Sequence, residues 1–248
     1  KSMRELFGRL EPISPAYRDR DVRLEQLDAQ GLGGAFLFPT LGVGMQESMR
    51  HDPEAACAAF SGFNRWLEED WGFAYGDRLF AAPYLSLMDP DWARAEADRL
   101  IERGARLISM VPGPVPLGDA SRSLADPSYD AVWARINEAG VTVAFHAGDA
   151  GYRAFTAEAW GGTREFRAFE YDALLGCLSP EPIHDTFAAL ICHGLFDRHP
   201  RLRIASIECG STWVASLVRK LKKSYGQLPG AYKRDPVEAL RSHCWVAP

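Results

Sequence analysis

Two polar residues, His146 and Glu208, stand where the site of an α/β enzyme would lie. His146 directly follows the predicted strand 141–145, and Glu208 directly follows the predicted strand 203–207. Neutral imidazole is the commonest protein ligand for a metal ion, and a carboxylate is an accepted companion for zinc. The equal placement of the two residues therefore predicts a shared catalytic site with a divalent metal ion, whereas either residue alone would be interpreted as structural.

Four further residues follow His146 and are candidates for binding a substrate. Asp149, Tyr152 and Arg153 come in the loop directly after it, and Trp160 lies in the long segment before residue 183. We expect the first three to contact the substrate and Trp160 to form part of a lid. The alternative, that all four belong to ordinary loop structure, stays open at this point.

None of the other histidines follows a predicted strand. His51, His184 and His199 fall in predicted turns or in a first helical turn, where a cation is not favoured. His193 falls at the end of a predicted helix. His243 begins the last predicted strand, which puts it at the opposite end of the strands from the predicted site.

His146 and Glu208 can form one site only if the fold brings the ends of their two strands together. Strands and helices alternate along this chain. Short apolar runs predict six strands, at 35–39, 79–87, 106–111, 141–145, 203–207 and 243–246. Aspartate–proline caps and helical spacing predict helices at 21–30, 52–72, 89–104, 126–140, 183–196 and 213–226. This alternation implies a parallel sheet covered by helices, with the site at the carboxyl ends of the strands.

Periodicity alone leaves two architectures open, a doubly wound sheet and a barrel. A dinucleotide-binding fingerprint would favour the doubly wound sheet. The glycines at 31–34 precede a strand, however, and the run 42–44 is followed by Glu47 where the third glycine would stand. P-loop and GxSxG motifs are absent as well. A nucleotide-binding domain is therefore the weakest of the functions considered.

Composition narrows the class of protein further. The chain has 248 residues, 47% hydrophobic and 25% charged, which is the balance of a globular domain. A net charge of −5 argues against nucleic acid as a partner, and the predicted partner is a small-molecule substrate of the enzyme. Five scattered cysteines without a CxxC pair predict reduced thiols and a cytoplasmic protein. No apolar run approaches the ~20 residues that span a bilayer, so no membrane segment is expected; a homo-oligomer stays open.

Three stretches of the chain resemble one known family. Residues 189–203 (ALICHGLFDRHPRLR), 145–149 (FHAGD) and 208–213 (ECGSTW) are similar to amidohydrolase-related proteins of amidohydrolase family 2. The resemblance is to the subgroup that includes aminocarboxymuconate-semialdehyde decarboxylase and hydroxybenzoate decarboxylases. It covers most of the chain, and the first stretch is its most specific part. It implies a (β/α)₈ TIM barrel with a metal site at its mouth.

The resemblance also assigns the candidate residues. In this family the metal is held by a His-x-His after strand one, a histidine after strand five, in many members a histidine after strand six, and an aspartate after strand eight. His146 matches the strand-five ligand, whereas Glu208 stands where many members have histidine. The chain contains no His-x-His. The resemblance thus implies that residues 1–248 form one incomplete barrel domain holding strands two to seven, with zinc expected and manganese or iron open.

Two functions follow from these expectations. The first is a metal-dependent hydrolase or carboxy-lyase that acts on a small carboxylate or cyclic substrate. The second is a non-catalytic barrel protein with a degenerate metal site, for which the departure at Glu208 is the argument. The residues present are expected to be inactive alone, to bind metal weakly, and to associate through uncovered apolar side chains at Phe36, Phe38 and Val246.

Overall fold

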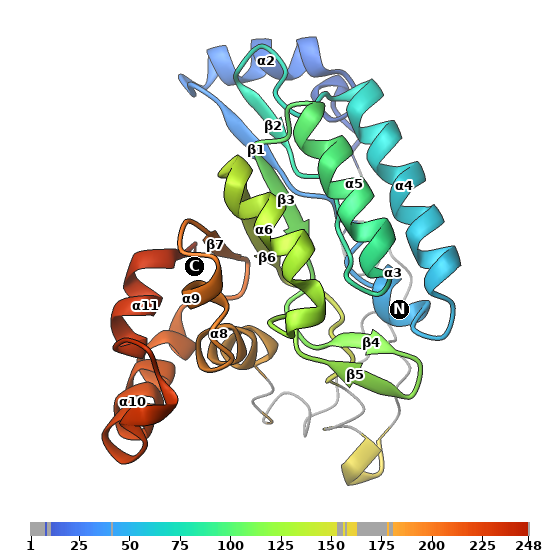
Figure 1. Cartoon of the computed structure of the whole chain (residues 1–248). Helices are drawn as coiled ribbons and strands as arrows, with labels where there is room; N and C mark the ends of the chain where they lie inside the picture. Colours follow the sequence, from blue (N-terminus) through green and yellow to red (C-terminus); the bar gives the residue numbers. More distant parts are fainter. Residues whose placement is uncertain are drawn as a thin grey trace.

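The computed structural model describes residues 8, 11–40, 42–152, 156, 158–162, 178 and 181–247. Strands and helices alternate along most of this chain, which confirms the predicted α/β class (Figure 1). The strands are β1 (Ala35–Leu37), β2 (Leu79–Ala81), β3 (Leu107–Met110), β4 (Val115–Leu117), β5 (Ala120–Arg122), β6 (Thr142–His146), β7 (Arg203–Ile207) and β8 (Cys244–Val246).

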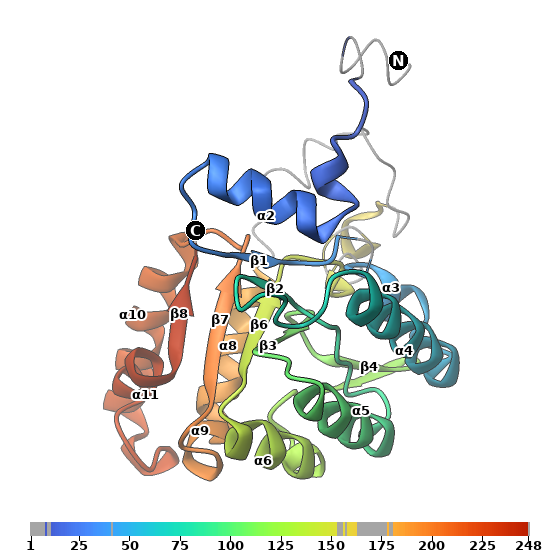
Figure 2. The same ribbon diagram turned by 90° about the horizontal axis from the view of Figure 1, so that it is seen from above.

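The helices lie between these strands. The α-helices are α2 (Arg20–Ala29), α3 (Met45–Ser48), α4 (Pro53–Asp70), α5 (Pro90–Glu102), α6 (Asp130–Ala139), α8 (Pro182–Cys192), α9 (Leu195–Arg198), α10 (Thr212–Gln227) and α11 (Pro236–His243). Short 3₁₀ turns are η1 (Pro15–Tyr17), η2 (Pro127–Tyr129), η4 (Glu158–Trp160) and η5 (Pro229–Ala231). In Figure 2 the helices from α4 to α11 follow one another in an arc around the strands.

The parallel strands are ordered as they occur in the chain. β1 pairs with β2, and β3, β6, β7 and β8 form a second parallel sheet in that order. A backbone bridge between Tyr84 and Ser109 links the two sheets. Ser109 donates to the carbonyl of Pro83 at 2.7 Å, and Leu85 donates to the carbonyl of Ser109 at 3.0 Å. The order does not reverse, as it would in a doubly wound sheet.

Aspartate caps begin the helices where the sequence predicts them. The Asp52 carboxylate accepts from the backbone N–H of Ala55, and the Asp89 carboxylate accepts from those of Asp91 and Trp92. A proline follows each cap, at a position where its missing N–H costs nothing. These local signals fix the start of α4 and α5, and thereby the length of the loops at the carboxyl ends of the preceding strands.

Several predicted elements are shorter than expected, and two of the differences have a clear physical cause. The strand predicted over 79–87 is regular only through Ala81, because Pro83 has no N–H to donate to a neighbouring strand. The helix predicted over 183–196 divides into α8 and α9 at Gly194, whose φ of 69° lies in the left-handed region. Both differences follow from a single residue that cannot continue the regular backbone.

The elements that were not predicted are the strands β4 and β5, the helices α3 and α11, and the turns η1, η4 and η5. β4 and β5 form an antiparallel hairpin that turns at Gly118, where φ is 65°. Helix α11 begins behind the capping Asp235 and Pro236, the same signal that marks the other helices. The expectation that His243 begins the last strand is wrong, because it is the last residue of α11.

The core lies between the sheet and the helices. Phe145 of β6 contacts Phe187 of α8 edge-on at 6.3 Å between ring centroids, and Phe187 stacks on Trp213 of α10 at 5.0 Å. All three side chains are buried. Burying a large apolar side chain stabilises a fold by about 1.5–3 kcal/mol, so these contacts hold α8 and α10 against the sheet.

The other face of the sheet is apolar and hollow. A cavity of about 480 Å³ is lined by residues of β1, β2, β3, β6 and β7, by Phe38 after β1, and by Asp77 and Arg106 just before β2 and β3. Phe36, at the rim, is 61% exposed, whereas Phe38 and Val246, also expected to be uncovered, are partly buried. The inner face therefore presents apolar surface beside the carboxyl ends of β6 and β7.

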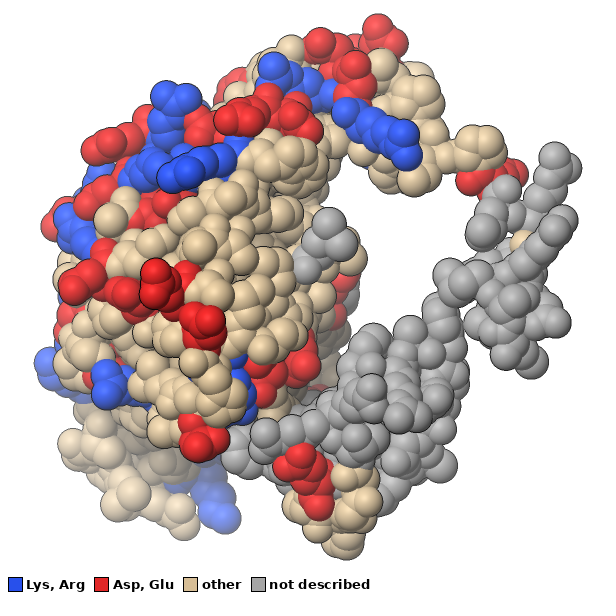
Figure 3. Space-filling view, turned by 90° about the vertical axis from the view of Figure 1, so that its right-hand side faces the viewer, with Lys and Arg blue, Asp and Glu red and all other residues tan. Residues whose placement is uncertain are grey.

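The outer surface mixes both signs of charge. On the face in Figure 3, Lys and Arg side chains alternate with Asp and Glu and form no single basic surface. Within the described residues, none of the helices combines the length and apolar character required to cross a bilayer.

Candidate functional site

His146 is the last residue of β6, and its ring is held in one orientation. The side chain is almost buried, with 8% of the residue exposed, and the ring stacks on Phe38 at 5.4 Å. Nδ1 lies 2.9 Å from the carbonyl oxygen of Ala147. Since a carbonyl only accepts, Nδ1 carries a proton, so in the neutral form of the ring the lone pair is on Nε2. A metal-ligating histidine is commonly fixed by such a bond from its other nitrogen.

Glu208 follows β7, the strand next to β6. Its Oε2 lies 3.3 Å from Nε2 of His146, so the structure brings the two predicted site residues together. The Glu208 side chain is 73% exposed. Its backbone φ is 54°, a left-handed conformation that costs a residue with a side chain roughly 1 kcal/mol. Strained backbone of this kind is concentrated at functional sites.

The loop after His146 packs closely on the segment after β1. A Cβ at Gly148 would lie 2.6 Å from the carbonyl oxygen of Val43, and Asp149 donates its N–H to the same oxygen at 2.8 Å. Gly151 has a φ of 73°, and a Cβ there would lie 2.7 Å from the Glu47 carboxylate. Glycine is required at both positions for the two loops to meet at this end of the strands.

Two of the predicted substrate-binding residues, Asp149 and Tyr152, form hydrogen bonds with neighbouring protein groups. The Asp149 carboxylate accepts from the N–H of Gly151 at 2.9 Å and so caps its own loop. The Tyr152 hydroxyl donates to Asp185 of α8 at 3.1 Å. Trp160 is 69% exposed in η4, and Arg153 lies outside the described residues. Their role in substrate binding stays a prediction.

Tyr152 belongs to a polar group that sequence reasoning missed. Asp185 also accepts from Nδ1 of His184 at 2.8 Å, so one carboxylate joins the loop after β6 to α8. Burial and the charge of Asp185 raise the pKa of the Tyr152 phenol. Nε2 of His184 is buried with no hydrogen-bond partner in the described part of the chain. The adjacency of His184 and Asp185 at a helix start was the available signal.

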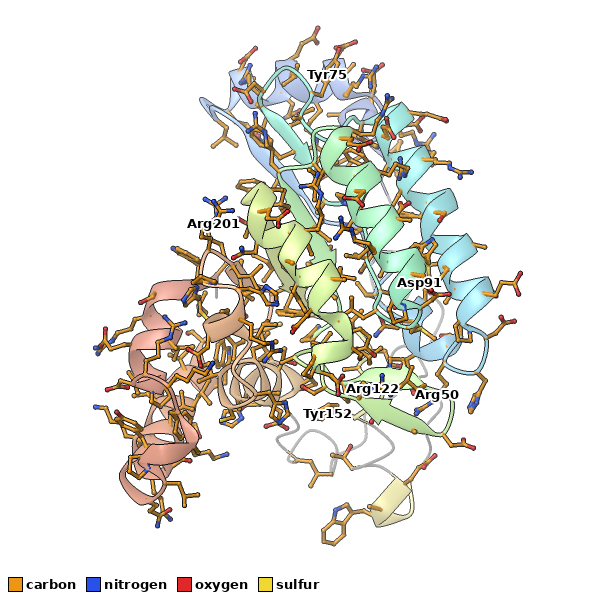
Figure 4. The ribbon with its side chains drawn as sticks, in the orientation of Figure 1. Arg50, Tyr75, Asp91, Arg122, Tyr152 and Arg201 are labelled. Atoms are coloured by element: carbon orange, nitrogen blue, oxygen red, sulfur yellow. The ribbon has the colours of Figure 1, made fainter. Side chains whose placement is uncertain are left out.

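The remaining histidines lie away from His146. Nδ1 of His193, exposed at the end of α8, lies 2.8 Å from the Ser123 hydroxyl, and Nε2 of His199 lies 3.1 Å from an Asp130 carboxylate oxygen. In Figure 4, Arg50, Arg122 and Tyr152 mark the end of the molecule that carries the β4–β5 hairpin.

Comparison with known proteins identifies the family. The amidohydrolase family profile matches residues 19–246. The chain belongs to the amidohydrolase family. An amidohydrolase from Mycobacterium avium subsp. paratuberculosis K-10 is 46% identical, with a TM-score of 0.87 over 94% of this chain and 59% of that one. The chain thus spans about three fifths of that relative's length. None of the curated proteins matches it in sequence.

More distant amidohydrolase structures share the fold. A 2,6-dihydroxybenzoate decarboxylase complexed with 2,6-dihydroxybenzoate is 22% identical, with a TM-score of 0.66 over 98% of this chain and 71% of that one. A dihydroxybenzoic acid decarboxylase from Polaromonas sp. JS666, with bound manganese and the inhibitor 2-nitroresorcinol, is 18% identical, with a TM-score of 0.61 over 98% and 69%. The family predicted from residues 145–149, 189–203 and 208–213 is confirmed.

Proposed function

We propose that this amidohydrolase-family chain carries part of the active site of a metal-dependent hydrolase or carboxy-lyase that acts on a small carboxylate or cyclic substrate. One observation carries the proposal: Nε2 of His146 and Oε2 of Glu208 lie 3.3 Å apart at the ends of adjacent parallel strands. With Nδ1 occupied by the Ala147 carbonyl, two lone-pair atoms face each other. Such a pair requires a shared cation, either a proton or a metal ion.

The two side chains fit a divalent metal in both spacing and chemistry. Two ligands about 2.0–2.2 Å from one ion lie roughly 3.3–3.6 Å apart at a tetrahedral angle. Among the described residues, no group of three or more His, Cys, Asp and Glu side chains could hold a metal. A catalytic site normally has at least three protein ligands. We therefore assign His146 and Glu208 as two ligands and expect the others to lie outside the described residues.

The fold supports the same incomplete set of ligands. We propose that β1, β2, β3, β6, β7 and β8 correspond to strands two to seven of a (β/α)₈ barrel. Their parallel pairing in chain order supports this assignment. Under this assignment, the His-x-His pair and the aspartate that the family resemblance implies for strands one and eight lie on strands outside these six.

The bound ion would polarise a substrate oxygen or lower the pKa of a water molecule. Zinc is the ion we expect, and manganese is an alternative because it is bound in the decarboxylase from Polaromonas. His146, held by Ala147 and Phe38, orients its Nε2 lone pair toward that ion. The exposed carboxylate of Glu208 would supply negative charge to the bound ion.

Phe38 stacks on His146 and so places an apolar ring beside the ligand pair, which favours a substrate with an apolar ring. We keep Asp149, Tyr152 and Arg153 as substrate contacts and Trp160 as part of a lid, on the basis of their place after His146. A cytoplasmic location, a homo-oligomeric assembly and the absence of nucleic-acid and membrane partners belong to the same proposal.

The assignment is tested by metal binding. We expect His146→Ala to weaken zinc and manganese binding at least tenfold, measured by calorimetric titration of chelator-treated full-length protein, because a neutral ligand is lost. Glu208→Gln keeps the side-chain length but removes the charge, and should weaken binding similarly. His193→Ala, at an exposed histidine that contacts Ser123, is the matched control and should bind as wild type does.

Two outcomes would count against the enzyme. Unchanged metal affinity in both His146→Ala and Glu208→Gln would remove the site. Full-length protein carrying all eight barrel strands that binds neither metal, although folded by circular dichroism, would favour the alternative of a barrel protein with a degenerate metal site.

A further inference from the structure

His243, at the opposite end of the sheet from His146, is buried and fully engaged. It is the last residue of α11 and is 4% exposed. Its ring stacks on Phe196 of α9, with 4.5 Å between centroids and 12° between planes. Nδ1 lies 2.8 Å from the carbonyl oxygen of Leu202, and Nε2 lies 3.0 Å from Nη2 of Arg234.

These contacts fit only the neutral form of His243. The Leu202 carbonyl only accepts, so Nδ1 must carry a proton. The guanidinium of Arg234 only donates, so Nε2 must be unprotonated. If His243 were an imidazolium, its Nε2–H would point at an N–H of the Arg234 guanidinium, which is also a donor and also positively charged. Protonation therefore breaks the bond between His243 and Arg234.

Arg234 extends the contact to α9. Its Nε lies 3.2 Å from an Asp197 carboxylate oxygen. Arg234 and Asp197 are the charged groups that face His243, one from the segment before α11 and one from α9. Both residues line a cavity of about 260 Å³, which also includes Phe196, the ring on which His243 stacks.

The elements joined here include the last strand of the sheet. Cys244, the residue after His243, begins β8 and pairs with Ile204 of β7. Leu202, which accepts from His243, lies just before β7. The bonds of His243 thus set where β8 meets β7, the strand that carries Glu208 at its other end.

We propose that His243, Arg234 and Asp197 form a pH-sensitive latch that holds α11 and β8 against α9 and β7 while His243 is neutral and releases them when His243 binds a proton. The proposal depends on which atoms of His243, Leu202 and Arg234 can donate or accept a hydrogen bond. It is independent of the reaction that the protein catalyses.

The direction of the pH effect follows from linkage. Burial lowers the pKa of His243 below its ordinary value of 6.5; the hydrogen bond to Leu202 and the charge of Asp197 oppose this effect, and the charge of Arg234 adds to it. The unfolded or released state therefore takes up a proton at a higher pH than the latched state. The latch is intact above about pH 6.5, and it weakens as the pH falls from there towards the lowered pKa.

Hydrogen exchange of the β8 amides tests the latch. Ala247 donates its N–H to the Ser206 carbonyl, so the peptide covering 244–247 reports the pairing of β8. After correction for intrinsic rates, we expect its protection to fall between pH 7.5 and 5.0, roughly tenfold for each unit of pKa difference. The peptide covering 142–146, in the same sheet, should not change.

His243→Asn is the decisive variant, because the introduced side-chain amide can donate to Leu202 and accept from Arg234 but cannot titrate. We expect its 244–247 protection to be the same at both pH values. Arg234→Gln removes the cation but keeps a donor, so the loss of 244–247 protection at pH 5.0 should be smaller than in wild type. His51→Asn, at an exposed histidine, is the control and should respond as wild type does.

Two results would overturn the latch. One is wild-type protection at 244–247 that is constant over this pH range. The other is a loss in His243→Asn equal to that of wild type. If His243→Asn does not fold, NMR titration decides: a His243 pKa at or above that of His51 contradicts the proposal.

Discussion

At the scale of single residues, Glu208 combines strain with a functional position. Its backbone φ of 54° is left-handed, and glycine or asparagine would adopt this conformation at a lower free-energy cost than glutamate. Asparagine adopts this conformation readily, so Glu208→Asn should relieve the strain. Glu208→Gln retains both the side-chain length and the strain, and therefore isolates the loss of the carboxylate. An exposed pair such as that with His146 is itself worth only about 0–1 kcal/mol.

We expect Glu208→Asn to be more stable than Glu208→Gln by about 0.5–1 kcal/mol, measured by urea unfolding, because only the first change relaxes the backbone. Both variants lack the carboxylate that faces His146. Equal stability of the two would mean that the backbone at this position is not strained and that the conformation has no bearing on function.

At the scale of elements, Asn64 of α4 replaces a missing strand partner. β2 loses its regular pairing near Pro83, and the buried Asn64 amide takes over at Tyr84. It donates to the Tyr84 carbonyl and accepts from the Tyr84 N–H, each at 2.8 Å, and it also donates to Glu96 of α5 at 2.8 Å. One side chain thus holds the end of β2, α4 and α5 together.

Asn64→Leu leaves the Tyr84 backbone groups and Glu96 without this partner. Each buried unsatisfied group costs about 1–3 kcal/mol, so we expect a loss of roughly 2–4 kcal/mol in the free energy of unfolding, measured by denaturant titration. Asn137→Leu is the control, since Asn137 accepts only one exposed bond, from the N–H of Arg201. A loss no larger than the control's would show that water replaces the amide.

The sequence anticipated the elements that carry local signals. Aspartate–proline caps located the starts of α4 and α5, and apolar runs located β6 and β7 with the polar residues that follow them. It did not reveal the β4–β5 hairpin, since the exposed residues 120–122 show no alternation of apolar and polar types. The contact of Tyr152 with Asp185 joins residues 33 positions apart, and no local pattern specifies such a contact.

At the scale of the whole molecule, apolar surface is left uncovered on the inner face of the sheet. In the described part of the chain β1 pairs only with β2, and β8 pairs only with β7. Phe36 at one edge is 61% exposed and Trp245 at the other is 51% exposed, with the apolar cavity between the two edges. Contiguous exposed apolar surface and single-sided edge strands both promote association.

We therefore expect residues 1–248 to self-associate, and Phe36→Lys to weaken the association at least tenfold in sedimentation velocity, because a charge on the inner face must be desolvated when two such faces meet. A tenfold change corresponds to about 1.4 kcal/mol, less than the contribution of one buried aromatic side chain. Trp66→Lys is the control, since Trp66 is exposed on the outer helix α4 and packs against Phe63. If both variants associate as wild type does, or if wild type is monomeric at the highest concentration measured, the inner face is not an association surface.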